Sequence, residues 1–215
     1  MGAGPLLQWS WVSQQSSQIL SLLLQHVELT LLAVGFGLAI SVPVGVGAHR
    51  YVALRPPVMG FAGALYVVPS VALLSLAAPI TGFFTVTTAE VALVSYTLLI
   101  LIRNIVAGLD SVPPHVVDAA RAMGYSRLQL LVRVQLPMAL PSLIAGIRVA
   151  TVTTIGLVNV TAFVGQGGLG QLIIQGFQDN FGTPVVVALL ASVLLAGIAD
   201  LLIAGMGRLL TPWAR

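Results

Sequence analysis

Long runs of apolar residues that carry almost no charge constrain this chain more than any other feature of its sequence. Residues 29–48 and 58–78 contain no Asp, Glu, Lys or Arg, and residues 86–108 and 184–207 are nearly as apolar. A helix of about 20 such residues crosses the hydrocarbon core of a bilayer. Residues 141–164 form a fifth, weaker candidate, because polar residues dilute its apolar character. The pattern predicts an all-α integral membrane protein with about five transmembrane helices.

Composition argues against several classes of function. Charged residues make up 7% of the 215 residues, whereas soluble domains contain roughly 25%. The formal charge of +3 comes from nine arginines without any Lys, and they are too scattered to predict nucleic-acid binding. With no Cys, disulfides and iron–sulfur clusters are excluded. We expect no secretory signal, because the first arginine, Arg50, follows the first long apolar run.

The arginines indicate the orientation of the spans. With five spans, alternate connections lie on opposite sides of the membrane, and every arginine outside a span falls on the same side. These residues are Arg50, Arg55, Arg121, Arg127, Arg133, Arg208 and Arg215. Arg103 and Arg148 lie inside spans but toward the same side, where their side chains can reach the interface. By the positive-inside rule, the N-terminus is expected outside and the C-terminus in the cytoplasm.

These spans divide the chain into three regions. Trp9 and Trp11, followed by a polar stretch, favour an interfacial helix near the N-terminus over an additional span. The predicted regions are an N-terminal extracytoplasmic or interfacial segment (1–25), a transmembrane domain (26–210) with a cytoplasmic loop at 110–137, and a cytoplasmic tail (211–215).

The loop between the third and fourth spans is the longest polar stretch between spans. Asp110 or Ser111 could cap a first short helix, and Gly124 could end it by adopting a positive φ. Asp118 and Arg121 are three residues apart and are expected to pair on one face of this helix. Its other face carries mostly small side chains, which permit close approach of another surface: Val116, Ala119, Ala120 and Met123.

A second short helix is predicted after the glycine. Ser126 and Gln129 have the spacing of a capping box, in which each side chain satisfies a backbone N–H of the other residue. Pro137 and Pro141 follow, and we expect them to prevent this helix from continuing unbroken.

The loop resembles the EAA loop of permeases from binding-protein-dependent ABC importers. That pattern is Glu-Ala-Ala, three residues, Gly, nine residues, Ile, any residue, Leu-Pro. This chain has the same spacing, with Asp118 in place of Glu and Val134 in place of Ile. The resemblance implies a type I ABC importer permease fold whose loop docks on a separate ATPase dimer, which binds the ATP and Mg. The implied coupling residues are Asp118, Ala119, Ala120, Arg121, Met123, Gly124, Leu136 and Pro137.

Further motifs resemble the osmoprotectant group of these permeases, which import glycine betaine, carnitine, choline or proline. In chain order they occupy residues 67–74, 103–104, 136–141, 145–148 and 165–170. The resemblance places this chain in the cytoplasmic membrane of a bacterium and implies three protein partners: an ATPase dimer, an extracytoplasmic substrate-binding protein, and a second permease subunit, identical or related. Methionine and phosphonate importers share the general plan and are the alternatives.

Candidate pathway residues lie where spans are interrupted. Pro69 frees a backbone carbonyl that Ser70 could satisfy, and such breaks line cavities in transporters, although a simple packing kink is the alternative. The candidates are Pro69, Ser70, Tyr66, Tyr96, Asn159, Thr161 and Phe163. Quaternary ammonium groups are usually bound by aromatic cages, yet only 7% of this chain is aromatic. We therefore expect specificity to reside mainly in the binding protein. Phe163, Tyr66 and Tyr96 could form a partial cage, but packing or belt positions are the favoured interpretation of these aromatics.

The remaining polar residues do not predict catalysis. Asp200 in the fifth span needs a partner, and Arg148 and Arg103 are the available cations, so a structural ion pair is expected. The three histidines are far apart in sequence and predict no metal site. The chain has no Walker motif, paired acids or Ser/His constellation. A stand-alone channel or secondary transporter is the rival class, but an EAA-type loop would have no role in it.

Overall fold

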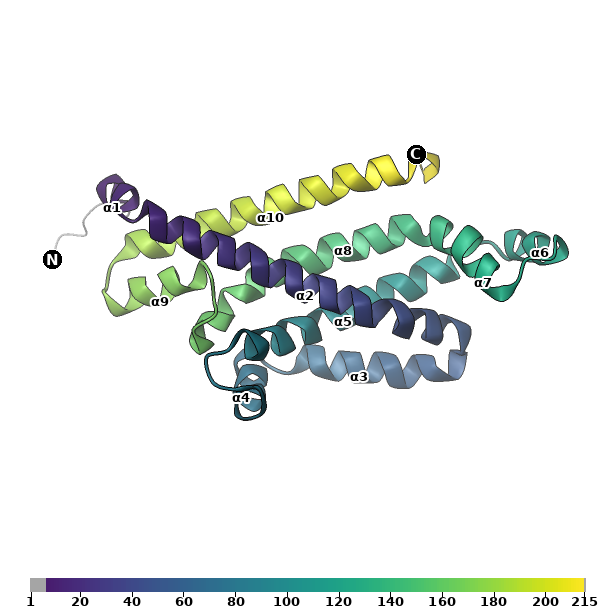
Figure 1. The fold of residues 1–215 in the computed structure, drawn as a ribbon, viewed down its shortest axis with the longest axis horizontal. Helices are drawn as coiled ribbons and strands as arrows, with labels where there is room; N and C mark the ends of the chain where they lie inside the picture. The colour runs from purple at the N-terminus through teal and green to yellow at the C-terminus, as the bar shows by residue number, and fades with distance from the viewer. Residues whose placement is uncertain (1–6, 215) are drawn as a thin grey trace.

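The computed structural model describes residues 7–214, which fold as a bundle of helices (Figure 1). The long and short α-helices are α1 (Trp9–Gln14), α2 (Ser16–Arg50), α3 (Arg55–Val67), α4 (Ser70–Thr81), α5 (Val86–Asp110), α6 (Pro114–Ala122), α7 (Arg127–Leu130), α8 (Leu136–Val158), α9 (Gly170–Gln178) and α10 (Gly182–Leu210). Short 3₁₀ segments are η1 (Val52–Leu54), η3 (Val160–Val164) and η4 (Pro212–Ala214), and η2 (Leu131–Gln135) is π-helical. Residues 1–6 of the predicted N-terminal segment and Arg215 of the predicted tail lie outside the described part.

Four single helices and one broken pair are long and apolar enough to cross a membrane. The single helices are α2, α5, α10 and the continuous helix Arg127–Val158, which joins α7, η2 and α8. The fifth candidate consists of Val52–Val67 and Ser70–Thr81, which meet at an angle of 99°. The prediction of about five spans is confirmed in this form. Helix α1 and η4 lie at opposite ends of the bundle, as five crossings require (Figure 1).

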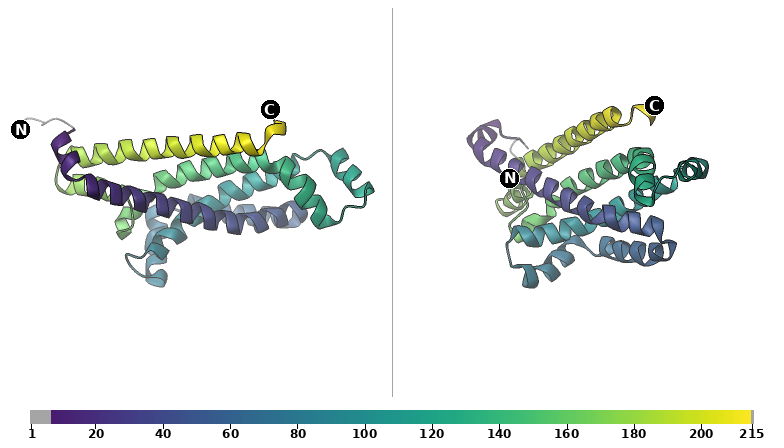
Figure 2. Two further views of the ribbon diagram at one scale, coloured as in Figure 1. Left: turned by 45° about the horizontal axis from the view of Figure 1, so that its top comes forward. Right: turned by 45° about the vertical axis from the view of Figure 1, so that its right-hand side comes forward.

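Helix α5 lies at the centre of the bundle and packs against α2, α8, α3 and α4 (Figure 2). Glycines allow the close approach of its neighbours. A Cβ at Gly37 of α2 would lie 2.0 Å from the hydroxyl oxygen of Thr97, and one at Gly146 of α8 would lie 2.5 Å from Cβ of Asn104. Because lipid provides no hydrophobic force between helices, such small residues let dispersion contacts hold membrane helices together.

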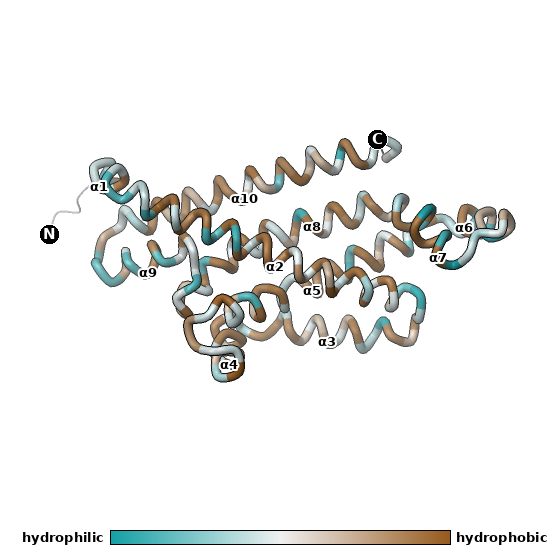
Figure 3. Tube along the Cα trace, viewed as in Figure 1, coloured by the Kyte–Doolittle hydropathy of each residue, from teal (hydrophilic) through white to brown (hydrophobic). Residues whose placement is uncertain are grey.

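The two ends of the bundle differ in character from its middle. Apolar residues follow the long helices, and polar residues gather at both ends (Figure 3). We call the end that carries α6, α7 and the C-terminal end of α10 the loop end, and the end that carries α1 and α9 the opposite end (Figure 1). The main neighbours of helix α10 are α8 and α9. Most of the apolar surface of α10 is not covered by other parts of the described chain.

The helix that contains the first predicted span begins well before that span. Helix α2 starts at Ser16 and runs without a break for 35 residues, or about 52 Å at 1.5 Å per residue. The expected boundary near residue 25 is therefore not a helix boundary, and only α1 is a separate N-terminal helix. The polar residues from Ser16 onward form the first turns of α2. Packing stabilises this part of the helix, because Leu22 lies in a buried cluster with Leu169 and Leu172.

The fourth span also differs from the prediction at both ends. Its helix starts in the loop at Arg127 and passes Pro137 and Pro141, and it ends at Val158, where η3 follows. The π-helical turn at 131–135 directly precedes Pro137, which occupies the first turn of α8. A wider turn relieves the clash between a proline ring and the preceding carbonyl. The prolines therefore do not interrupt the helix, contrary to the expectation.

Candidate functional site

The loop helix α6 begins differently from the prediction. Its N-cap is Pro113, which offers no side-chain cap. Asp110 is the last residue of α5, and its carboxylate accepts from Nδ1 of His49 at 2.7 Å and pairs with Arg55 at 2.9 Å. The hydroxyl of Ser111 donates to the carbonyl of Gly108 at 2.7 Å. Asp110 thus ties the end of α5 to the end of α2 and to α3 instead of capping α6.

The corner after α6 has the predicted geometry. Asp118 and Arg121 pair at 3.3 Å, and both side chains are largely exposed. Gly124 has a φ of 83°, in the left-handed region that favours glycine. The N–H of Tyr125 donates to the carbonyl of Ala120 at 3.2 Å, which closes the end of the helix. The result is a short rigid helix that projects from the bundle.

The small-residue face of α6 is partly buried and partly exposed. Ala120 is buried against the loop, while Ala119 is exposed and Met123 is 69% exposed. An exposed methionine beside an alanine provides an adaptable apolar contact for another protein. The exposed part of α6 is therefore available to a partner.

The second loop helix connects this corner directly to a span. Ser126 and Gln129 form the predicted capping box, with hydrogen bonds of 2.8 and 3.3 Å. Leu136 and Pro137 lie at the start of α8, in the continuous helix that enters the membrane region. A displacement of the corner would therefore be transmitted along one helix into the bundle.

Four of the candidate pathway residues lie at the break between α3 and α4. Pro69 separates the two helices and Ser70 begins α4. The hydroxyl of Tyr96 on α5 donates to the carbonyl of Val68, so a tyrosine satisfies a carbonyl at the break, and not Ser70 as expected. The rings of Tyr66 and Tyr96 meet edge to face with centroids 5.8 Å apart. This group has the character of a packed joint.

The other three candidates follow the end of α8. The amide of Asn159 donates to the hydroxyl of Ser192 on α10 at 3.3 Å. The hydroxyl of Thr161 donates to the carbonyls of Val158 and Gln166. Phe163 is 66% exposed. Helix α4 packs against η3, so the two groups of candidates occupy neighbouring elements, but no described cavity contains residues of both.

Asp200 on α10 forms a bidentate pair with Arg148 on α8. The guanidinium donates from Nε at 2.8 Å and from Nη2 at 2.7 Å, one bond to each carboxylate oxygen. Arg103 is exposed on α5 and takes no part in this pair. Both members of the pair remain partly exposed within the chain. Exposure of an ion pair to hydrocarbon is unfavourable, so this face requires protein or water beside it.

The pair lies in a groove between α8 and α10. Three adjoining cavities of about 360, 440 and 260 Å³ follow these helices. The first two share Ala145 and Arg148, and the last two share Val152, so the groove extends from Thr211 to Asn159. Sequence patterns gave no sign of this groove.

Two polar features were missed because each depends on contacts between distant elements. Glu90 is 8% exposed, and both carboxylate oxygens lack a hydrogen-bond partner among the described residues. The sequence signal that could have identified Glu90 was its position as an acidic residue within the apolar run 86–108. His26 is fully buried, where Nε2 lies 2.9 Å from the carbonyl of Ile155 and Nδ1 accepts from the N–H of Leu169 at 3.3 Å. This histidine fastens α2 to α8 and to the glycine-rich turn before α9.

Within residues 7–214, no cluster of three or more His, Cys, Asp or Glu is placed to hold a metal ion. The glycine-rich segment 165–170 turns the chain from η3 into α9, with positive φ at Gly165 and Gly168. A Cβ at Gly168 would lie 2.7 Å from Cβ of His26. Close packing therefore explains this glycine.

A helical membrane bundle with a projecting helix–glycine–helix loop is the architecture of a transporter subunit moved by another protein. Residues 34–211 match the family model described as "Binding-protein-dependent transport system inner membrane component". The chain belongs to this family. It is therefore a multi-pass inner-membrane permease of an ABC importer, a non-catalytic subunit that works with an ATPase and a binding protein.

Similar proteins and solved structures agree with this assignment. The osmoprotectant import permease protein OsmW of Salmonella typhimurium is 36% identical over 206 residues, covering 94% of this chain and 96% of OsmW. The glycine betaine/carnitine/choline transport system permease protein OpuCD of Bacillus subtilis is 31% identical, covering 94% and 89%.

Among solved structures, an inward-facing methionine ABC transporter, MetNI, matches with a TM-score of 0.78 and 25% identity over 88% of this chain and 94% of that one. An amino acid ABC transporter with histidines gives the same TM-score at 16% identity, over 94% and 98%. The fold is therefore that of type I ABC importer permeases, as predicted.

Proposed function

We propose that this chain is the membrane-spanning permease subunit of a bacterial importer for osmoprotectants such as glycine betaine, carnitine, choline or proline. The observation that carries the proposal is the loop: an EAA-type pattern that forms a projecting helix, a glycine corner and a second helix continuous with a span. Relatives whose names specify osmoprotectants, carnitine or choline match most of the chain and support the substrate class.

Helix α6 docks on the ATPase in this proposal. Its exposed surface combines Ala119 and Met123 with the carboxylate of Asp118, which is exposed and can meet a cation on the partner. Closure of the ATPase pair on ATP displaces α6, and the corner at Gly124 fixes the direction of the displacement. Leu136 and Pro137 then carry it into α8. ATP and Mg bind to the ATPase subunits.

The continuous helix explains how a small loop can move a span. The 32 residues of Arg127–Val158 extend about 48 Å, which exceeds the thickness of the hydrocarbon core. A tilt imposed at the loop end therefore reaches the opposite end of the bundle. Helix α10 follows this motion, because the Arg148–Asp200 pair ties it to α8.

The orientation follows from the arginines. Among the described residues, the loop end gathers the arginines of the connections, whereas α1 and α9 at the opposite end carry none. The positive-inside rule places the loop end in the cytoplasm and the N-terminus outside. Docking of the loop on a cytoplasmic ATPase requires the same orientation.

A second permease subunit, identical or related, completes the pathway. The partly exposed Arg148–Asp200 pair in the groove favours protein or water over hydrocarbon on this face, and a second subunit would provide both. One copy with five spans also encloses no through-going channel among its described cavities. We place the pathway between the two subunits, with the residues at the α3–α4 break and after α8 as candidates for its outer gate.

Uptake measurements test the substrate class. The complete importer is expressed in cells that lack other osmoprotectant uptake, and labelled glycine betaine, choline and methionine are supplied separately. We expect ATP-dependent uptake of glycine betaine or choline and none of methionine. Uptake of methionine alone would assign the chain to a different branch of the family, and uptake without the ATPase would indicate a channel or secondary transporter.

A further inference from the structure

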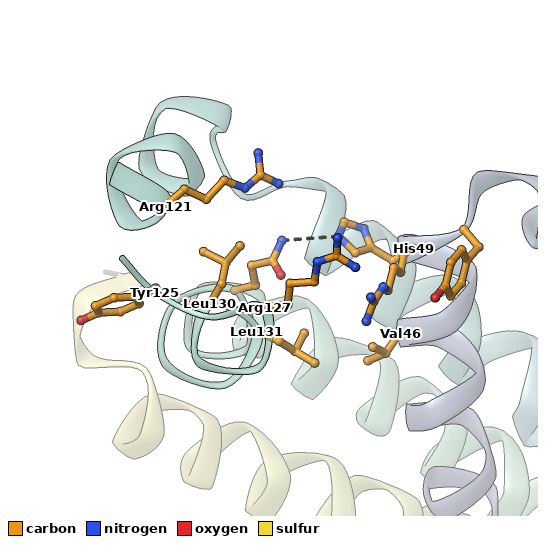
Figure 4. A pocket seen from close by; sticks show the side chains of 10 residues that line it. Val46, His49, Arg121, Tyr125, Arg127, Leu130 and Leu131 are labelled. Atoms are coloured by element: carbon orange, nitrogen blue, oxygen red, sulfur yellow. Dashed lines mark hydrogen bonds between the residues drawn. The ribbon is translucent and has the colours of Figure 1, made fainter. Parts of the chain in front are cut away.

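A cavity of about 650 Å³ opens at the loop end, between the end of α2 and the loop (Figure 4). Ten residues line it: Val46, His49, Arg50, Tyr51, Arg121, Tyr125, Arg127, Leu130, Leu131 and Gln135. Three of them are arginines and none is acidic. The cavity is separate from the groove between α8 and α10, with which it shares no residue.

The arginines come from three different elements and converge on this space. Arg121 reaches over the cavity from α6, and the guanidinium of Arg127 extends from α7 toward His49 (Figure 4). The guanidinium of Arg50 lies 5.3 Å from the ring centroid of Tyr51. Within residues 7–214, no carboxylate pairs with Arg50 or Arg127. Their positive charge is therefore not neutralised by a carboxylate among these described residues.

The nearest acidic side chains are already engaged. Asp110 does not line the cavity, and its carboxylate pairs with His49 at 2.7 Å and with Arg55 at 2.9 Å. With Nδ1 of His49 donating to that carboxylate, Nε2 can accept from the amide of Gln135 at 3.4 Å. Asp118 pairs with Arg121 on an exposed surface at 3.3 Å, where solvent weakens the interaction. The lining of the cavity thus contains three arginines and no carboxylate, and two of these arginines, Arg50 and Arg127, have no carboxylate partner among the described residues.

Apolar side chains lie directly beside these cations. Val46 and Leu131 contribute apolar lining to the cavity. Tyr51 is 55% exposed and Val52 is 69% exposed, at the point where the apolar run of α2 ends. Leu128 on α7 is 70% exposed. A basic pocket with apolar walls at the end of a span fits a ligand that carries both a phosphate and hydrocarbon chains.

We propose that this cavity binds the phosphate-bearing headgroup of an anionic phospholipid, with its acyl chains against α2 and η2. Arginines bind phosphate oxygens through charge-assisted hydrogen bonds, and basic pockets between membrane helices are typical headgroup sites. A soluble phosphate compound would use the same donors but leave the apolar walls uncovered. A bound lipid would join α2, α6 and α7, and so connect the loop to the bundle through a non-covalent bridge.

Native mass spectrometry of the purified full chain in detergent tests this proposal. Phosphatidylglycerol, and phosphatidylcholine with the same acyl chains, are titrated against the wild type and the double variant Arg50→Gln/Arg127→Gln. We expect one tight phosphatidylglycerol site that phosphatidylcholine does not fill. Each arginine near an anionic lipid contributes about fivefold in affinity, so the double variant should bind roughly twentyfold more weakly. Arg127→Lys, which keeps the charge, should retain most of the binding.

Arg133→Gln is the matched control, because Arg133 lies on the adjacent π-helical turn but does not line the cavity. An equal loss in Arg133→Gln would show general surface charge and overturn the proposal. Inorganic phosphate or glycerophosphoglycerol that competes as well as the lipid would overturn the lipid assignment. Unchanged lipid binding in the double variant, with loss of the co-purifying ATPase, would show that the cavity is an ATPase contact. Circular dichroism establishes that each variant is folded.

Discussion

Two proline-containing segments of this molecule behave in opposite ways. At Pro69 the chain bends by 99° between α3 and α4, whereas at Pro137 and Pro141 it continues as one helix. The difference lies in what surrounds each proline. A π-helical turn precedes Pro137, while Val68 before Pro69 is extended, with its carbonyl bonded to the hydroxyl of Tyr96. One segment is a joint, and the other is a rigid connection between the loop and the bundle.

The largest expected effect comes from breaking the rigid connection. Val134 lies in the π-helical turn, and Val134→Pro should destabilise the helix by about 3 kcal/mol or more. We expect substrate transport to fall at least tenfold, while the ATPase stays bound because α6 is intact. Co-purification and transport in proteoliposomes measure the two properties, with Val134→Ala as the control. Normal transport in Val134→Pro would show that the continuity of this helix is not needed.

An intermediate effect is expected where α10 is fastened to the rigid connection. Arg148→Met leaves Asp200 without its bidentate partner, and removal of one member of an ion pair in the membrane is worse than removal of both. Thermal unfolding in detergent should therefore give Tm values in the order wild type, Arg148→Met/Asp200→Leu, Arg148→Met. A single variant as stable as the double one would mean that the pair does not tie α10 to α8.

The smallest effect is expected at the joint. Tyr96→Phe removes the hydroxyl that bonds to the Val68 carbonyl, and a hydrogen bond between membrane helices is worth about 0.6 kcal/mol on average. Ser70→Ala should have even less effect, because Tyr96 provides the hydroxyl at the break. Unfolding measurements on both variants decide between the two side chains. A greater loss in Ser70→Ala would restore the serine to the role predicted from sequence.

Local features of the loop could be predicted from the sequence, because residues a few positions apart determine them. The Ser126 capping box, the pair of Asp118 and Arg121, and the positive φ of Gly124 all depend on short-range geometry. The number of spans was predictable because apolar runs of sufficient length have few alternatives.

Features that depend on distant contacts were not predictable in the same way. Asp110 or Ser111 was expected to cap α6, but the carboxylate of Asp110 pairs with His49 and Arg55 at the ends of other helices. The hydroxyl of Tyr96 donates to the carbonyl of Val68 at the α3–α4 break, 28 residues away in sequence. The cavity at the loop end and the groove along α10 likewise arise only when helices are brought together. Sequence patterns therefore described the coupling loop better than the pathway.

In the proposed function, the loop couples ATP hydrolysis to transport. Gly124 adopts a positive φ, and a Cβ added to it would meet no side chain or distant backbone within 4 Å, so only backbone conformation restricts substitution there. Gly124→Val should be strained by about 1–3 kcal/mol, whereas Gly124→Asn is tolerated because Asn adopts left-handed conformations more readily. The decisive measurement is ATP hydrolysis stimulated by loaded binding protein in reconstituted complexes of equal stoichiometry. We expect stimulation in the wild type and in Gly124→Asn and its loss in Gly124→Val. Full stimulation in Gly124→Val would show that the loop does not couple ATP hydrolysis to transport.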